Sequence, residues 1–152
     1  MKGKKKKEIF LHFDVINLME RIIQYRNDIK PDTESIIRVY QDAGLNRPIH
    51  ELNRIEQMYM NSNLIVSAWH NNILIGIARS LTDYSFCCYL SDLAVCKKYQ
   101  CMGVGKKLIE LTKEYAGDSC MLLLLSAPSA MNYYPKMGFQ KAKNAFLQER
   151  IR

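Results

Sequence analysis

Apolar residues recur along the chain with two different periods, and these periods predict which segments form helices and which form strands. Helical spacing of apolar side chains occurs at Ile36, Ile37, Val39 and Tyr40, and again in the stretch after Gly103. Alternating or continuous apolar runs predict strands, and residues 121–125 are apolar throughout, as in a strand buried on both faces. The predicted strands cover residues 22–25, 64–69, 73–81, 86–95 and 121–125, and the predicted helices cover residues 33–44, 48–60, 103–115 and 128–137.

Turn residues separate these elements and set their order. Asn71-Asn72 predicts a tight hairpin turn between two strands, and Pro31-Asp32-Thr33 predicts a helix start. Gly138-Phe139 is expected to begin a closing strand pair that reaches towards Gln148. The resulting order is β-α-α-β-β-β-α-β-α-β(-β). It predicts an α/β protein, layered as in α+β folds, whose central mixed sheet is flanked by helices.

Length and composition indicate one globular domain. A chain of 152 residues is long enough to bury a substantial core, and 48% hydrophobic with 24% charged residues is typical of soluble proteins. No apolar run approaches the ~18 residues that a membrane-spanning helix needs. The basic N-terminus is followed by a polar stretch rather than by an apolar signal core, so we expect neither a membrane partner nor export.

The positive charge is concentrated at the N-terminus. Five lysines and one glutamate in residues 1–8 supply four of the seven net positive charges. We therefore expect residues 1–18 to be a basic, disordered extension and residues 19–152 to be the single domain. A lysine run binds RNA through charge alone, and this one contains no interleaved aromatic residues, so nucleic acid is not the expected partner.

The cysteines indicate neither a metal site nor a disulfide framework. The chain has an odd number of them without paired C-x-x-C spacing, at positions 87, 88, 96, 101 and 120. Reduced thiols in a cytoplasmic protein are the simplest interpretation, and no metal is expected.

A glycine turn joins the strand at 86–95 to the next helix. Gln100-x-x-Gly103-x-Gly105 lets the backbone approach a bulky anion, and the N–H groups of a first helical turn point towards such a ligand. A dinucleotide fingerprint would need a third glycine where Leu108 stands. A Walker motif would need Ser or Thr after the lysine. The turn therefore predicts a phosphate site that suits neither NAD nor ATP.

Three stretches together resemble the GNAT superfamily of acyl-coenzyme A N-acetyltransferases. They are LSDLAV at 90–95, the glycine turn at 100–105, and AMNYYPKMGF at 130–139, which is similar to the family ending A-x-x-[LF]-Y-x-K-x-G-F. The likeness covers roughly residues 20–150. It implies a mixed, mostly antiparallel sheet and acetyl-CoA as cosubstrate.

The resemblance also implies which residues hold the cosubstrate. Main-chain groups of Leu93, Ala94 and Val95 would pair with the pantetheine arm, and one N–H, that of Val95, would face the thioester carbonyl oxygen. The pyrophosphate would bind a loop formed by Gln100, Cys101, Met102, Gly103, Val104, Gly105, Lys106 and Lys107.

Two kinds of proton transfer are required of such an enzyme. Tyr134 matches the family tyrosine that protonates the departing thiolate, so it is the expected general acid, whereas Tyr133 occupies the usual packing position. Asp92 is the candidate general base, with a capping or ion-pair role as its alternative. Glu51 and Asp83 are weaker candidates for the base.

The expected function is transfer of an acetyl group from acetyl-CoA to a primary amine of a small acceptor. The alternative is a GNAT-like domain that binds coenzyme A as a sensor or interaction module without turnover. The resemblance leaves monomer and homodimer open, with residues 145–152 as a strand edge for a dimer. Residues expected to line the acceptor cleft are Tyr40, Arg47, Tyr84, Phe86 and Tyr89.

Overall fold

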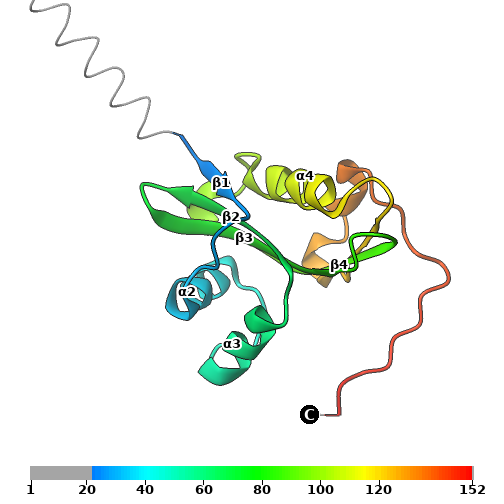
Figure 1. Cartoon of the computed structure of the whole chain (residues 1–152), viewed down its shortest axis with the longest axis horizontal. Coiled ribbons are helices and arrows are strands. Elements are labelled where there is room, and N and C mark those ends of the chain that lie inside the picture. The colour runs from blue at the N-terminus through cyan, green and yellow to red at the C-terminus, as the bar shows by residue number, and fades with distance from the viewer. Residues whose placement is uncertain (1–21, 152) are drawn as a thin grey trace, which may run out of the picture.

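The computed structural model describes residues 22–151, and its centre is one five-stranded sheet (Figure 1). The strands lie side by side in chain order, with antiparallel pairing from β1 to β4 and a parallel pair between β4 and β5. This confirms the expected mixed, mostly antiparallel sheet. The strands are β1 (Gln24–Arg26), β2 (Leu64–His70), β3 (Ile73–Thr82), β4 (Cys87–Val95) and β5 (Met121–Leu123).

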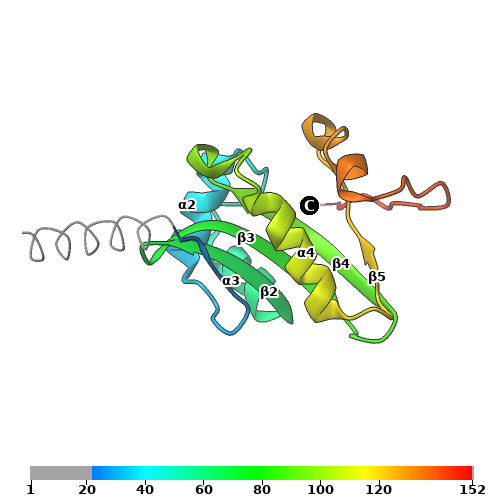
Figure 2. The same ribbon diagram turned by 90° about the horizontal axis from the view of Figure 1, so that it is seen from above.

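Helices cover both faces of the sheet and give three layers. On one face pack α2 (Thr33–Ala43) and α3 (Leu52–Met60), and on the other packs α4 (Val104–Ala116) (Figures 1 and 2). Each face has its own apolar cluster, one around Tyr40 and Ile77 under α2 and α3, the other around Leu90 and Leu108 under α4. The predicted β-α-α-β-β-β-α-β order is confirmed up to this point. β5 is shorter than predicted and is not buried on both faces, because Met121 and Leu123 are 58% and 38% exposed.

The end of the chain differs from the expectation. The predicted helix over 128–137 is instead two short 3₁₀ helices, Pro128–Ala130 and Tyr134–Met137. Pro135 has no N–H to donate, which interrupts the hydrogen-bond ladder that a continuous α-helix needs.

The predicted closing strand pair is wrong, because residues 139–151 form no strand. Figure 1 shows this segment running outside the layers. Every residue from Gln140 to Ile151 is exposed, so no burial offsets the entropy of ordering a strand pair.

β4 contains a bulge, and the bulge changes which side chains face which helix. Arg79 and Ser80 are consecutive on β3, yet they pair with Asp92 and Leu90, which leaves Ser91 as an extra residue. Before the bulge, Leu90 packs in the α4 cluster. After it, Asp92 reaches Tyr40 on α2.

β4 and β5 pair over a short stretch and then separate. Three residue pairs join them, the last between Tyr89 and Leu123. Residues 90–95 of β4 therefore have no neighbour on the β5 side, and Figure 2 shows the two strands diverging. The divergence begins at the bulge and leaves the end of β4 beside an open edge.

Candidate active site

The glycine turn places an open helix N-terminus at the end of β4. Gly103 is the N-cap of α4 with φ 84°, and neither a side-chain cap nor an acidic residue occupies the first turn. The first N–H groups of a helix have no partner within the helix, so this end attracts an anion. Gln100 ties the turn to the strand, because its Nε2 donates to the Val95 carbonyl at 2.9 Å.

The predicted cosubstrate residues differ in what they expose. Cys101, Met102 and the side chains of Lys106 and Lys107 are exposed, whereas Val104 is buried in the α4 cluster. Ala94 and Val95 are also buried, and Leu93 is half-buried against the same cluster as Val95. The side chains at these buried positions are therefore shielded, and the main-chain contacts that the resemblance implies stay a prediction.

We expect Gly103→Ala to lower the free energy of unfolding by about 1–2 kcal/mol, because a side chain is strained at positive φ. A Cβ atom at this position would contact nothing within 4 Å, so the cost is conformational. Urea denaturation measures it. Gly103→Asn should lose less, since asparagine tolerates this conformation, and the exposed Met102→Ala is the control. Equal losses in the alanine and asparagine variants would contradict the explanation.

Two adjacent tyrosines, Tyr133 and Tyr134, lie at the start of the last 3₁₀ helix. The rings of Tyr133 and Tyr134 meet edge to face with centroids 5.3 Å apart, and Tyr134 meets Phe139 similarly at 5.6 Å. Burial raises the pKa of both phenols, and Tyr133 adds to the rise at Tyr134. Both groups are therefore protonated at neutral pH, as a general acid must be.

The sequence interpretation missed the position of the Tyr133 hydroxyl. A Cβ atom built on Gly105 would lie 3.0 Å from Tyr133 Oη, so this hydroxyl reaches the first turn of α4. Tyr133 therefore packs against the glycine turn itself. The sequence feature that could have drawn attention to Tyr133 is a second hydroxyl directly beside the family tyrosine. Only the fold shows where that hydroxyl lies.

Asp92 forms buried ion pairs. Its side chain is 0% exposed and binds the guanidinium groups of Arg79 and Arg47, while the Tyr40 hydroxyl donates to Oδ2 at 2.8 Å. Burial alone would raise the pKa of this carboxyl, but the two arginines hold it below its ordinary value. A carboxylate whose oxygens are occupied in this way is a poor base. The structure thus favours the ion-pair alternative.

The weaker base candidates are also engaged. Asp83 Oδ1 accepts backbone N–H groups from Ser85, Phe86 and Cys87, and these hold the pKa of Asp83 far below its usual range. Glu51 pairs with Arg54 at 3.0 Å. The general base is therefore not assigned to any of the three.

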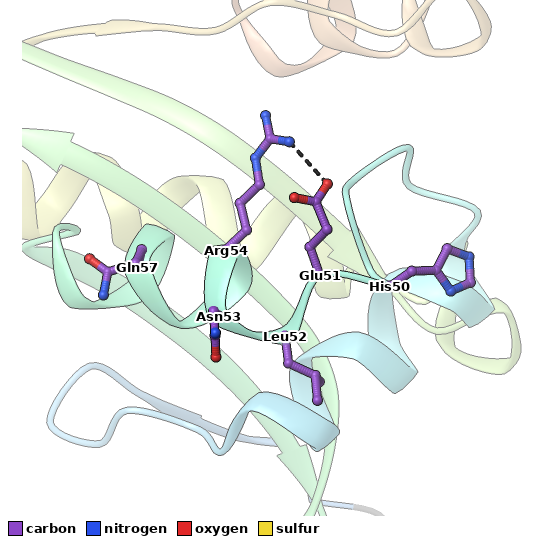
Figure 3. Close-up of a pocket in the computed structure, with 6 residues that line it drawn as sticks. All are labelled: His50, Glu51, Leu52, Asn53, Arg54 and Gln57. Carbon is purple, nitrogen blue, oxygen red and sulfur yellow. Dashed lines mark hydrogen bonds and ion pairs between the residues drawn. The ribbon is translucent and has the colours of Figure 1, made fainter. Parts of the chain in front are cut away.

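A surface hollow of about 640 Å³ lies over the first turns of α3 (Figure 3). In the figure, Glu51 and Arg54 point towards one another, and the His50 ring lies away from them. The hollow shares no residue with the glycine turn. It is lined by His50, Glu51, Leu52, Asn53, Arg54 and Gln57.

The residues expected to line an acceptor cleft separate into two groups. The prediction that Tyr40 lines the cleft is wrong, because Tyr40 is fully buried and its hydroxyl lies 2.6 Å from that of Tyr59. Arg47 is engaged with Asp92. Tyr84 and Phe86 are exposed in the turn before β4, at the opposite end of the strand from the glycine turn, and the Tyr84 hydroxyl donates to the Asn63 carbonyl at 2.6 Å. Tyr89 is half-buried in β4, where it pairs with Leu81 and Leu123.

Two absences hold within residues 22–151. No group of three His, Cys, Asp or Glu side chains there is arranged to hold a metal ion. No helix in that range is long and apolar enough to cross a membrane.

Solved structures share this fold. A probable acetyltransferase of unknown function from meticillin-resistant Staphylococcus aureus superposes with a TM-score of 0.73 at 23% identity, over 86% of this chain and 99% of that one. The aminoglycoside N-acetyltransferase AAC(6')-Iy, in complex with CoA, superposes with a TM-score of 0.67 at 14% identity, over 86% and 96%.

Sequence comparison gives the family. An uncharacterized N-acetyltransferase, ycf52, of Pyropia yezoensis is 26% identical over 96 residues, which is 59% of this chain and 55% of that protein. The match thus spans about half the length of this curated relative. The model of the acetyltransferase (GNAT) domain matches residues 36–152, most of the chain. The chain therefore belongs to the GNAT acetyltransferase family.

Proposed function

We propose that this chain transfers an acetyl group from acetyl-CoA to a primary amine of a small acceptor by direct transfer. The observation that carries the proposal is the open N-terminus of α4 beside the unpaired end of β4, with Tyr134 packed against the apolar cluster that contains Val95 and Val104. The AAC(6')-Iy structure of the same fold, in complex with CoA, supports the choice of cosubstrate.

The glycine turn fits the pyrophosphate of the cosubstrate. Its first-turn N–H groups attract the phosphates, and Lys106 and Lys107 add positive charge at the surface. The main chain of residues 93–95 would bind the pantetheine arm in the gap that β5 leaves. One N–H there, which we assign to Val95, would stabilise the oxyanion, an effect typically worth ~3 kcal/mol.

The chemical step then needs one acid. The amine nitrogen attacks the thioester carbonyl carbon, the C–S bond breaks, and coenzyme A leaves as a thiolate that takes a proton from the Tyr134 hydroxyl. An unperturbed phenol, with a pKa of ~10, matches a thiolate of similar basicity, and burial raises the pKa of Tyr134 above that value. The attacking amine loses its own proton to water.

A small acceptor is supported by a structural neighbour and not by the exposed aromatic rings. Tyr84 and Phe86 lie in the turn before β4, at the opposite end of that strand from the glycine turn. A structural neighbour from an uncultured soil metagenome is an aminoglycoside acetyltransferase in complex with sisomicin, which supports a small amine acceptor.

Thiol release from acetyl-CoA, measured with a panel of small amines and with lysine-rich peptides, tests the proposal. Release that depends on a small amine is the expected result. Tight binding of coenzyme A without release by any acceptor would instead favour the sensor or interaction module. Release with peptides alone would contradict the small acceptor.

We also propose a cytoplasmic homodimer. All five cysteines are free thiols, which suits a reducing compartment. Phe146, Leu147 and Ile151 are largely exposed, and such apolar surface favours association through this segment. Light scattering of the purified chain measures the mass, and a monomer at micromolar concentration would contradict the dimer.

A further inference from the structure

Two arginines from different layers hold the bulged residue of β4. Arg47, in the connection between α2 and α3, donates from Nη2 to the Ser91 carbonyl at 2.7 Å. Arg79 on β3 donates from Nη2 to the Ser91 hydroxyl at 2.8 Å. The next residue, Asp92, binds the Nε of both guanidinium groups. One buried carboxylate thus orients two donors onto its neighbour. We call Arg47, Arg79, Ser91 and Asp92 the bulge clamp.

We propose that the bulge clamp positions the cofactor-binding end of β4, and that Arg47 is the clamp residue that can be replaced without unfolding the protein. This rests on the proposed function, in which residues 93–95 bind the pantetheine arm. The bulge lies between Tyr89, the last residue paired with β5, and those residues. Its geometry therefore sets the direction in which the strand leaves β5.

The bulge needs an outside donor. A bulged residue drops out of the regular ladder, and a backbone carbonyl without a partner is costly when it is shielded from water. Arg47 supplies that partner for Ser91. A planar guanidinium can bind a carboxylate and a carbonyl together, whereas a lysine ammonium has no such fork.

The bulge clamp contains two positive charges and one negative charge, so Arg47 can be replaced without leaving a buried charge unpaired. Asp92 and Arg79 are 0% and 7% exposed and neutralise one another. Arg79 also donates to Ser62 and lies over the Tyr59 ring. Arg47 is 27% exposed and adds a positive charge that the buried pair does not require. Its removal leaves no unpaired charge in the core, so the variant is expected to fold.

Calorimetric titration with coenzyme A tests the role of Arg47. We expect Arg47→Ala to weaken binding at least tenfold while the melting temperature falls less than in Asp92→Ala, and Arg47→Lys to resemble the alanine variant. Added ethylguanidinium should restore much of the affinity of Arg47→Ala, and ethylammonium should not. The control is Arg26→Ala. Arg26 is an exposed arginine on β1, and it binds Asp28 through Nε and Nη2.

Several outcomes would overturn the inference. Unchanged affinity in Arg47→Ala would do so, as would wild-type affinity of the lysine variant, equal loss of affinity in Arg26→Ala, or rescue by both additives. Failure of both Arg47 variants to fold would also overturn it, because the charge argument requires Arg47 to be dispensable for folding.

Amide hydrogen exchange separates this inference from the proposed function. In the ligand-free protein, Arg47→Ala should speed exchange at residues 92–95 more than at β2. Unchanged exchange would reject the bulge clamp even if wild type acetylates amines. If wild type binds no coenzyme A, the proposed function fails, and faster exchange in the variant would still support the clamp.

Discussion

Replacing Tyr134 by phenylalanine is expected to lower kcat about a hundredfold, since a positioned general acid contributes 10²–10⁴. That loss corresponds to ~2.7 kcal/mol of activation free energy. The ring still packs edge to face on Tyr133 and Phe139, so the fold should persist. Coenzyme A affinity should change little, because the hydroxyl is needed only when the thiolate leaves. Steady-state thiol release and titration calorimetry measure the two quantities separately.

Tyr133→Phe is the matched control for this experiment. It removes the same atom from the adjacent ring, and its hydroxyl lies against the first turn of α4. We expect it to alter cosubstrate affinity more than kcat. If Tyr133→Phe loses the larger share of kcat, the general acid is Tyr133, and the role implied by the resemblance has moved by one residue.

Asp92→Ala is expected to have the largest effect on stability, a loss of about 3–5 kcal/mol in the free energy of unfolding. Arg79 is 7% exposed and would keep a buried charge without its partner. The melting temperature should fall by on the order of 10 °C. Urea denaturation and calorimetry provide the measurement. Asp28→Ala, which breaks an exposed pair with Arg26, should change stability little. Similar losses in both variants would contradict a special role for the buried pair.

The same carboxylate makes stability depend on pH in a defined direction. The pKa of Asp92 is lower in the folded protein than its ordinary value, so the folded state favours the charged form. This stabilisation is fully present above the unfolded pKa near ~4 and is lost as pH falls through the lower folded pKa. Asp32 and Asp83 act in the same direction. Asp92→Asn should flatten the acid limb, and an unchanged slope would contradict this.

Local signals in the sequence predicted most of the sheet and helices. Asp32 was expected to begin a helix, and its side chain accepts the Ser35 N–H at 2.8 Å. Asn71 and Asn72 were expected to turn a hairpin, and both have positive φ. Such residues act through their own backbone, so a single sequence is sufficient to place them.

The features that were missed depend on contacts between distant residues. Alternation along β4 assumes that every residue pairs with β3, and the bulge at Ser91 breaks that assumption. The partners of Asp92, Arg47 and Arg79, lie 45 and 13 positions away in the chain. No local pattern shows the bulge or these ion pairs. Tyr40 is a different case, because its helical spacing with Ile36 and Val39 indicated a buried face and all three are buried.

The bulge in β4 also restricts how the chain can change length. Pairing the same residues without the bulge would bring Ser91 opposite Arg79 and turn every later side chain of the strand to the other face. Asp92 would then enter the apolar layer under α4, and Val95 would leave it. Deleting Ser91 would keep these faces but would remove the carbonyl and the hydroxyl that Arg47 and Arg79 bind. The number of residues in β4 and the face on which Asp92 lies therefore depend on each other.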